Sequence, residues 1–268
     1  MHFFVKVTES EALTTMDQAA TMTHRLTSLD YLSALYAQGR LGFFFRSKDG
    51  RVSYELHRAD SLLELDARLK ANPQWPYARL EVMPVTKTGD MVRELTTYLK
   101  IDPNQFFADV LTRYQNAGWL QPAQVSSISA TLAVAGGDFL ALMSADEEEI
   151  DPEGTYTVVG KQSKETSASV SPEYLQEMWM RTLRSQVAHL NSGIELIDYN
   201  PVGRSEGILI GKGDLASLQS HIESTEIYPD TIVTYYPVNT ARQAGLQAVD
   251  TLARLRRTVP TLSHLNLA

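Results

Sequence analysis

The chain has 268 residues, of which 43% are hydrophobic and 21% are charged; this is the balance of a folded protein with room for two domains, not of a disordered one. It contains no cysteine, which excludes disulfides, thiolate metal sites and thiol catalysis. The formal net charge is −8, and no cluster of Lys or Arg is long enough to follow a phosphate backbone, so we expect no nucleic-acid partner.

The N-terminal apolar stretch, residues 1–7, is too short for a signal-peptide core and has no small-residue cleavage site after it. No window approaches the length of apolar sequence that a membrane span requires. We therefore expect a cytoplasmic protein without a membrane partner.

The first 85 residues predict the order strand, helix, strand, strand, helix, strand. Apolar residues spaced by three or four predict the first helix, Gly39 ends it, and Asp49-Gly50 is typical of a hairpin turn. Asp60 or Ser61 is the expected cap of the second helix. The expected strands are 3–7, 41–46, 51–57 and 77–83, and the first helix lies within 12–38.

The next stretch is less regular. We expect helices at 89–99 and 103–117, strands at 125–135 and 139–143 joined by Gly136-Gly137, and then the acidic run 146–149. Adjacent carboxylates are usually solvated, so we expect no metal there. The segment 102–154 is either a connection or a degenerate third repeat.

The order of the first copy then returns. Ser28-Leu29-Asp30-Tyr31-Leu32 corresponds to Ser171-Pro172-Glu173-Tyr174-Leu175, and Met83-Pro84-Val85 to Tyr236-Pro237-Val238, which indicates a duplicated domain. In the second copy we expect strands at 155–162, 194–200, 207–211 and 231–236, and helices at 171–191, 214–224 and 241–257. The predicted domains are 1–101, 102–154 and 155–268.

The βαββαβ order is typical of the ferredoxin-like α+β unit, in which two helices cover one face of a four-stranded sheet. We expect the two units to pack sheet to sheet as an intramolecular dimeric α/β barrel. Strand alternation predicts which residues of the first copy face away from the helices, into a partly polar cavity: Phe4, Lys6, Phe44, Arg46, Ser53, Glu55, His57, Tyr77, Arg79, Glu81 and Met83.

The first copy is similar to the muconolactone isomerase family of the dimeric α/β-barrel superfamily. The similarity rests on Phe4-Val5-Lys6, Gln38-Gly39, Phe45-Arg46 and, above all, Trp75-Pro76-Tyr77 followed by Leu80-Glu81-Val82. It implies a cofactor-independent enzyme that moves a proton in a small carboxylated lactone. Ser28 stands where the family has a glutamate on the first helix, and Leu41 stands where it has a tryptophan.

Proton transfer needs an acid or base near neutral pKa and a cation to hold the substrate. We assign His57, Glu55 and His24 as candidate catalytic residues. The candidate substrate-binding residues are Lys6, Arg46, Arg79, Glu81, Tyr77 and Phe44. The alternative is that the charged residues form cross-strand ion pairs, and that His24, like His189 and His221, is a surface residue of its helix.

The sequence thus predicts a cofactor-independent isomerase or lyase that acts on a small carboxylated lactone or an aromatic-degradation metabolite, without metal or cofactor. One alternative is a non-catalytic barrel that binds a metabolite or a protein, and another is a cofactor-free oxygenase. The expected partner is a small-molecule carboxylate, and the protein could pair further as a homodimer. A common void at Arg46 and His57 would favour the enzyme, and mutual salt bridges would favour the non-catalytic barrel.

Overall fold

The structure is a computed structural model that describes residues 1–118, 120–134, 136–143, 150–164, 180–181, 184, 195–201 and 206–258. The chain divides into two compact units. The first unit comprises Met1–Val85, Glu149–Thr155 and Pro237–Ala268, and the second comprises Thr86–Glu148 and Tyr156–Tyr236. The predicted second-copy helix at 171–191, including His189, and the acidic run 146–149 fall outside the described residues apart from short fragments.

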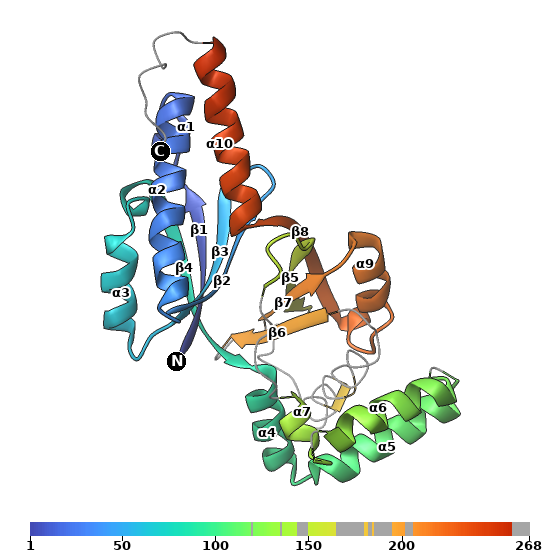
Figure 1. Cartoon of the computed structure of the whole chain (residues 1–268). Coiled ribbons are helices and arrows are strands. Elements are labelled where there is room, and N and C mark those ends of the chain that lie inside the picture. The colour runs from blue at the N-terminus through green and yellow to red at the C-terminus, as the bar shows by residue number, and fades with distance from the viewer. Residues whose placement is uncertain are drawn as a thin grey trace. The chain divides into compact units, whose positions relative to one another are not determined.

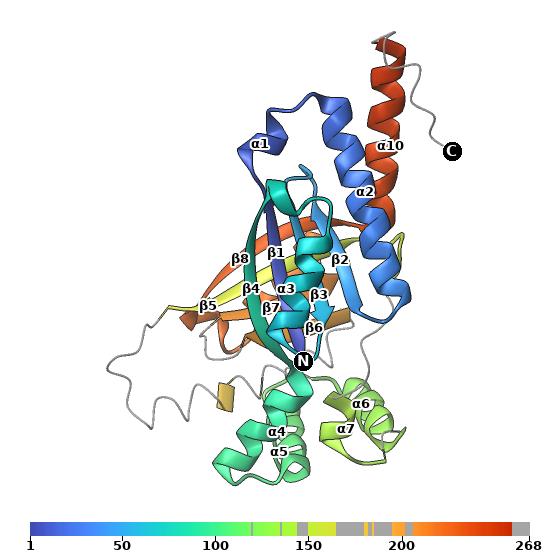
Figure 2. The same ribbon diagram turned by 90° about the vertical axis from the view of Figure 1, so that its left-hand side faces the viewer.

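In the first unit, four strands and two helices follow the predicted order (Figure 1). The elements are β1 (His2–Glu9), α1 (Glu11–Thr14), α2 (Gln18–Ala37), β2 (Leu41–Ser47), β3 (Val52–Arg58), α3 (Leu62–Ala71) and the 3-10 helix η1 (Trp75–Tyr77), followed by β4 (Ala78–Lys87). Asp17 caps α2 by accepting from the backbone amides of Ala19 and Ala20, and Ser61 caps α3 in the same way. The helix α10 (Ala241–Thr258) lies beside α2 (Figures 1 and 2).

The second unit begins with a group of helices: α4 (Thr88–Leu99), α5 (Pro103–Asn116), α6 (Pro122–Val134) and α7 (Phe139–Met143). They pack around a core that includes Phe106, Phe107 and Phe139. The predicted hairpin at 125–143 is therefore wrong. Gly136 and Gly137 have φ values of 73° and 78°, and their amides bond back to Ala133 and Leu132, so this pair ends a helix instead of turning a hairpin.

The remaining elements of the second unit are β5 (Tyr156–Ser163), β6 (Glu195–Pro201), β7 (Glu206–Lys212), α9 (Leu215–Glu223), the 3-10 helix η2 (Tyr228–Asp230) and β8 (Thr231–Thr240). Asp214 caps α9 as expected. Leu218 and Ile222 of α9 pack on Val159 and Leu209.

Within the part of the chain that the structure describes, the strands form a closed barrel in the order β1-β3-β2-β8-β5-β7-β6-β4. The prediction of two ferredoxin-like units packed sheet to sheet as an intramolecular dimeric α/β barrel is therefore wrong. The reason lies in β4 and β8, which continue through Pro84 and Pro237 and are longer than expected. The end of β8 pairs with β2, with Thr240 opposite Phe45 and Asn239 opposite Arg46, so the strands join side by side.

The strand register also corrects the predicted faces of β3. Val5 lies opposite Glu55, and Phe3 lies opposite His57; directly opposite residues share a face of the sheet. Phe3 and Val5 pack with Leu65 of α3. Ser53, Glu55 and His57 therefore lie under the helices, and not on the opposite face as we expected.

A register shift between Leu41 and Phe43 changes the faces of β2 as well. Beyond it, Phe44 packs with Leu41 and with Leu29 and Leu32 of α2. Arg46 follows Phe44 by two positions and shares its face. Two further predicted cavity residues, Phe44 and Arg46, thus also lie under the helices.

Candidate functional site

A row of three buried polar side chains follows β3 on the face under the helices. Ser53 Oγ donates to Glu55 Oε1 at 3.0 Å, and Glu55 Oε2 lies 2.8 Å from His57 Nε2. The three residues are 1–2% exposed. Alternate positions of one strand point to the same side, so the sequence pattern Ser-x-Glu-x-His brings these groups together.

His57 is the unusual member of this row. Its Nδ1 atom is buried and has no hydrogen-bond partner among the described residues. A buried ring nitrogen without a partner is unfavourable by an amount comparable to a lost hydrogen bond, and such groups often mark a functional position. The Glu55 carboxylate holds the other nitrogen, which fixes the orientation of the ring.

Tyr31 of α2 lies close to the same row. Its hydroxyl donates to the Arg68 carbonyl at 2.8 Å. Burial raises the pKa of Tyr31. The charges of Arg68 and Arg40 partly oppose this increase, and the Glu55 carboxylate adds to it.

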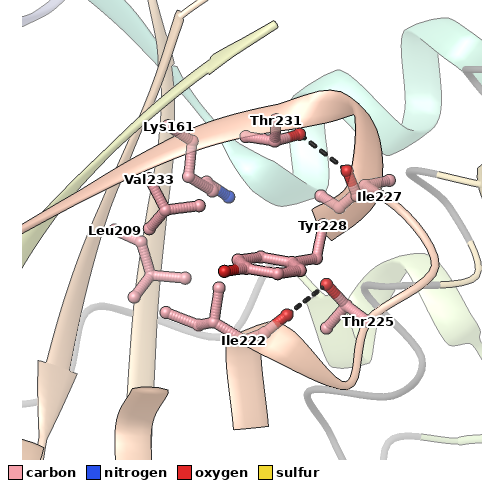
Figure 3. Close-up of a pocket in the computed structure, with 8 residues that line it drawn as sticks. All are labelled: Lys161, Leu209, Ile222, Thr225, Ile227, Tyr228, Thr231 and Val233. Atoms are coloured by element: carbon pink, nitrogen blue, oxygen red, sulfur yellow. Dashed lines mark hydrogen bonds between the residues drawn. The ribbon is translucent and has the colours of Figure 1, made fainter. Parts of the chain in front are cut away.

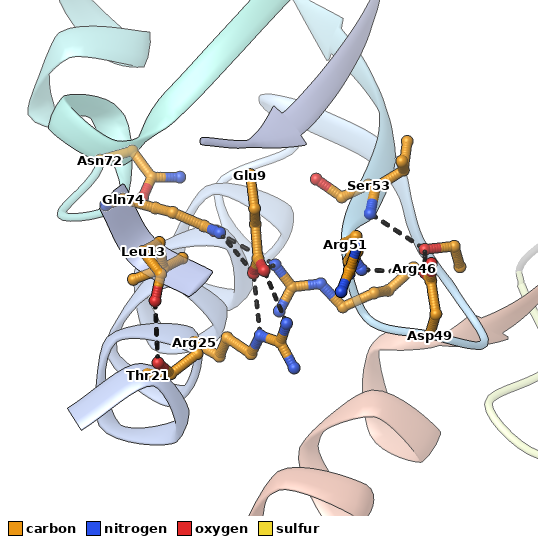
Figure 4. Close-up of polar contacts among 12 residues, drawn as sticks. Glu9, Leu13, Thr21, Arg25, Arg46, Asp49, Arg51, Ser53, Asn72 and Gln74 are labelled. Carbon is orange, nitrogen blue, oxygen red and sulfur yellow. Dashed lines mark hydrogen bonds and ion pairs between the residues drawn. The ribbon is translucent and has the colours of Figure 1, made fainter. Parts of the chain in front are cut away.

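A second polar network is centred on Glu9, at the end of β1 (Figure 4). Arg25 of α2 donates to both carboxylate oxygens, from Nε at 2.8 Å and from Nη2 at 2.6 Å. Arg46 and Gln74 donate to Glu9 Oε1 at 3.1 and 3.0 Å, and Arg46 also donates to Gln74 at 3.3 Å. One carboxylate thereby joins α2, β2 and the loop before η1.

Arg46 is the most deeply buried cation of this network, with its side chain 6% exposed. Burial lowers the pKa of Arg46 to about 10, and the Glu9 carboxylate opposes this decrease. Its Nε atom has no hydrogen-bond partner among the described residues. Arg46 and His57 therefore do not point at a common void, because Arg46 forms an ion pair with Glu9 and His57 contacts Glu55.

A cavity of about 290 Å³ lies beside this polar layer, within the first unit. Its walls come from α2, β2, the segment around Pro152 and the start of α10. The lining residues are Leu29, Leu32, Ser33, Tyr36, Leu41, Phe43, Phe44, Ile150, Pro152, Thr240, Ala241 and Arg242. Leu41 is the cross-strand partner of His57, and Phe44 is that of Glu55, so the cavity and the Glu55–His57 pair are one strand apart.

The second unit contains a much smaller space near Tyr228, of about 10 Å³ (Figure 3). Lys161 reaches it and forms a 2.8 Å ion pair with Asp198. A space of this size holds about one water molecule, so it is no candidate for a substrate site.

The other predicted site residues lie apart from the Glu55–His57 pair. Lys6 and Glu81 form a cross-strand ion pair at 3.3 Å, with side chains 34% and 46% exposed. Arg79 is exposed. The rings of His24 and Tyr77 are in contact in a tilted arrangement, with their centroids 5.0 Å apart. Lys6 and Glu81 thus form a cross-strand ion pair, as the alternative interpretation of the charged residues predicted.

Sequence reasoning missed Glu9, Arg25 and Gln74. Glu9 extends the alternation of Phe3, Val5 and Val7 by one step, and this periodicity was the signal that could have placed it under the helices. Arg25 and Gln74 gave no such signal, because their contacts depend on how α2 and η1 meet the strand.

Among the described residues, no group of three or more His, Cys, Asp or Glu side chains is placed to hold a metal ion. In the same part of the chain, no helix is both long enough and apolar enough to cross a membrane.

No protein-family model matches this chain, and no curated protein sequence matches it either. Solved structures do. Chlorite dismutase from Candidatus Nitrospira defluvii in complex with imidazole is 10% identical, with a TM-score of 0.50 over 92% of this chain and 94% of that one. A variant of the same enzyme gives the same four values, and another variant, in complex with cyanide, is 9% identical with a TM-score of 0.48 over the same shares.

At this identity the comparison concerns the fold alone, which is that of the chlorite dismutases. The predicted relationship to the muconolactone isomerase family is therefore wrong. The expectation of a cofactor-independent isomerase or lyase is wrong with it, because the structural neighbours are chlorite dismutases and not isomerases. The segment that most suggested that family, Trp75-Pro76-Tyr77, forms a 3-10 helix just before β4.

Proposed function

We propose that the chain binds heme and carries out heme-dependent chemistry on a small oxyanion. Its fold neighbours are chlorite dismutase-like heme proteins, which makes chlorite the first substrate to test. The observation that carries the proposal is the buried His57, with Glu55 on one ring nitrogen and no described partner on the other.

This pair has the donor arrangement that a heme iron uses. Heme iron is commonly held by one histidine nitrogen, and metal-binding histidines usually donate their other ring N–H to a carboxylate, which fixes the ring and makes it a stronger ligand. The chain has no cysteine, so thiolate ligation is excluded. Among the described histidines, His57 alone has a buried ring nitrogen without a partner.

In this proposal, His57 Nδ1 is the iron ligand and Glu55 is the positioning residue, itself held by Ser53. Bound heme would supply a redox-active iron. The His57 ring is 1% exposed, so heme can reach it only if neighbouring side chains move; Leu41, which lies opposite His57 and lines the cavity, is the first of these.

The test is a titration of hemin into the full-length protein, followed by its absorbance spectrum. We expect saturable binding with a shifted Soret band, and we expect His57→Ala to lose the shift and regain it when imidazole is added. Glu55→Gln keeps the ligand but removes the carboxylate, and should weaken heme binding by about 10- to 100-fold.

Two control variants separate the ligand assignment from the function. His24→Ala removes a histidine whose ring contacts that of Tyr77, and His189→Ala removes one that lies outside the described residues. Both should bind heme as the unsubstituted protein does. Loss of the spectrum in His189→Ala, with His57→Ala unchanged, would overturn the role of His57, and absence of any binding by the unsubstituted protein would overturn the proposed function.

A further inference from the structure

The cavity in the first unit opens partly to solvent, since Ser33, Tyr36 and Arg242 in its wall are exposed. Its volume is about 290 Å³. That is close to the lower end of the range found for small-molecule sites. Its size therefore indicates a compact ligand.

The walls are mostly apolar. Leu29 and Leu32 of α2 are buried on one side, and Leu41, Phe43 and Phe44 of β2 are buried on the other. Water molecules gain few hydrogen bonds against such walls. An alkyl or phenyl group would cover the walls and remove their apolar surface from water, which is favourable. The bulk of the ligand is therefore apolar.

The rim of the cavity carries one cation, Arg242, at the start of α10. Its Nε atom lies 2.6 Å from Glu153, and both side chains are more than 60% exposed. An ion pair this exposed contributes little to stability, so a ligand carboxylate could take the place of the Glu153 carboxylate. Because a guanidinium binds carboxylates through two parallel hydrogen bonds, Arg242 is suited to that role.

Hydrogen bonds hold the segment 152–154 against the start of α10. Thr240 Oγ1 donates to the Pro152 carbonyl at 2.6 Å, and Gln243 Nε2 donates to the Gly154 carbonyl at 3.1 Å. These bonds keep Ile150 and Pro152 in the wall and Arg242 at its rim. The cavity is thus formed before any ligand arrives.

We propose that this cavity binds a compact apolar monocarboxylate, with its apolar part among Leu32, Leu41 and Phe44 and its carboxylate on Arg242. This site goes beyond the proposed heme function, since no histidine lines the cavity. It also does not depend on that function.

The probe is octanoate, titrated by calorimetry into the full-length protein without added heme. We expect saturable binding of octanoate, with 1-octanol at least tenfold weaker and octylammonium weaker still. Arg242→Gln should weaken octanoate binding by about tenfold and leave 1-octanol unchanged, because a charge-assisted hydrogen bond is lost.

Arg254→Gln is the matched control, since Arg254 lies on the same helix and is similarly exposed, at 66%; it should bind octanoate as the unsubstituted protein does. Ser33→Trp tests the location. Ser33 lines the cavity from an exposed position, so the indole can block the entrance without disturbing the core, and we expect octanoate and 1-octanol binding both to be lost.

Equal binding of octanoate and octylammonium would overturn the proposal, as would undiminished octanoate binding by Arg242→Gln or by Ser33→Trp. Loss of heme binding leaves these measurements unaffected, so a failure of the heme proposal is distinguishable from a failure of this one. Thermal melting of each variant confirms that it is folded.

Discussion

Replacing Glu9 by Leu should be among the most destabilising single changes in the first unit. Glu9 is the anion shared by Arg25 and Arg46, and its side chain is 1% exposed. The pKa of Arg46 is already lowered to about 10 with Glu9 present, a shift that corresponds to about 3 kcal/mol against the charged form. Removing one partner of a buried ion pair costs about 3–5 kcal/mol, and we expect a loss in that range.

The double variant Glu9→Leu/Arg46→Met tests the reasoning. Replacing a buried ion pair by apolar residues of similar volume is often neutral or stabilising, and Arg25, which is 14% exposed, can turn toward water. The double variant should therefore recover most of the stability that Glu9→Leu loses. Urea unfolding followed by circular dichroism measures the difference in midpoint. A Glu9→Leu variant within about 0.5 kcal/mol of the unsubstituted protein, or a double variant as unstable as the two single losses added together, would refute this account.

Three further variants test the packing and the titration of single groups. Gly50→Ala should destabilise the first unit by about 1–3 kcal/mol, because Gly50 has φ +74° and an added Cβ would lie 2.6 Å from Nη1 of Arg25; unchanged urea midpoints would contradict this. Gly211→Ala should be destabilising because the added Cβ would lie 2.6 Å from Leu218. Leu218→Ala in the same chain should remove this clash, so the double variant should lose less stability than the two single variants added together. A strictly additive loss of stability would contradict the clash. Burial lowers the pKa of His221 below 6.5, so the folded state binds that proton less readily than the unfolded state; stability should fall as the pH drops from about 6.5 through the lowered pKa, and His221→Gln should show a smaller fall in pH-dependent melting.

The helices of this chain were predictable because their signals are local. Asp17 and Ser61 cap α2 and α3, and apolar residues at helical spacing define the faces that these helices bury. The segment Pro122–Val134 misled because its Val, Ile and Thr residues favour strands and the glycine pair that follows is also typical of a hairpin. As a helix, this segment packs against Phe106 and Phe107. Those contacts come from outside the segment, so its own residues could not indicate them.

The faces of β3 could not be read from alternation, because both faces of this strand are buried. Tyr54 and Leu56 are 4% and 0% exposed on one face, and Glu55 and His57 are equally buried on the other. Apolar alternation identifies the core only where one face is wet. Residue type thus selected Glu55 and His57 as candidates, but alternation placed them on the wrong face, and only the pairing of β3 with β1 shows where they lie.

The pairing of β2 with β8 has a consequence for synthesis of the chain. Lys48, just after β2, bonds to Asn239, which is 191 residues further along, so β2 has no partner on this side until nearly the whole polypeptide has left the ribosome. An unpaired strand rich in phenylalanine is a template for wrong association. Ribosome-bound fragments that end before β8 should therefore depend on chaperones until its arrival covers the strand.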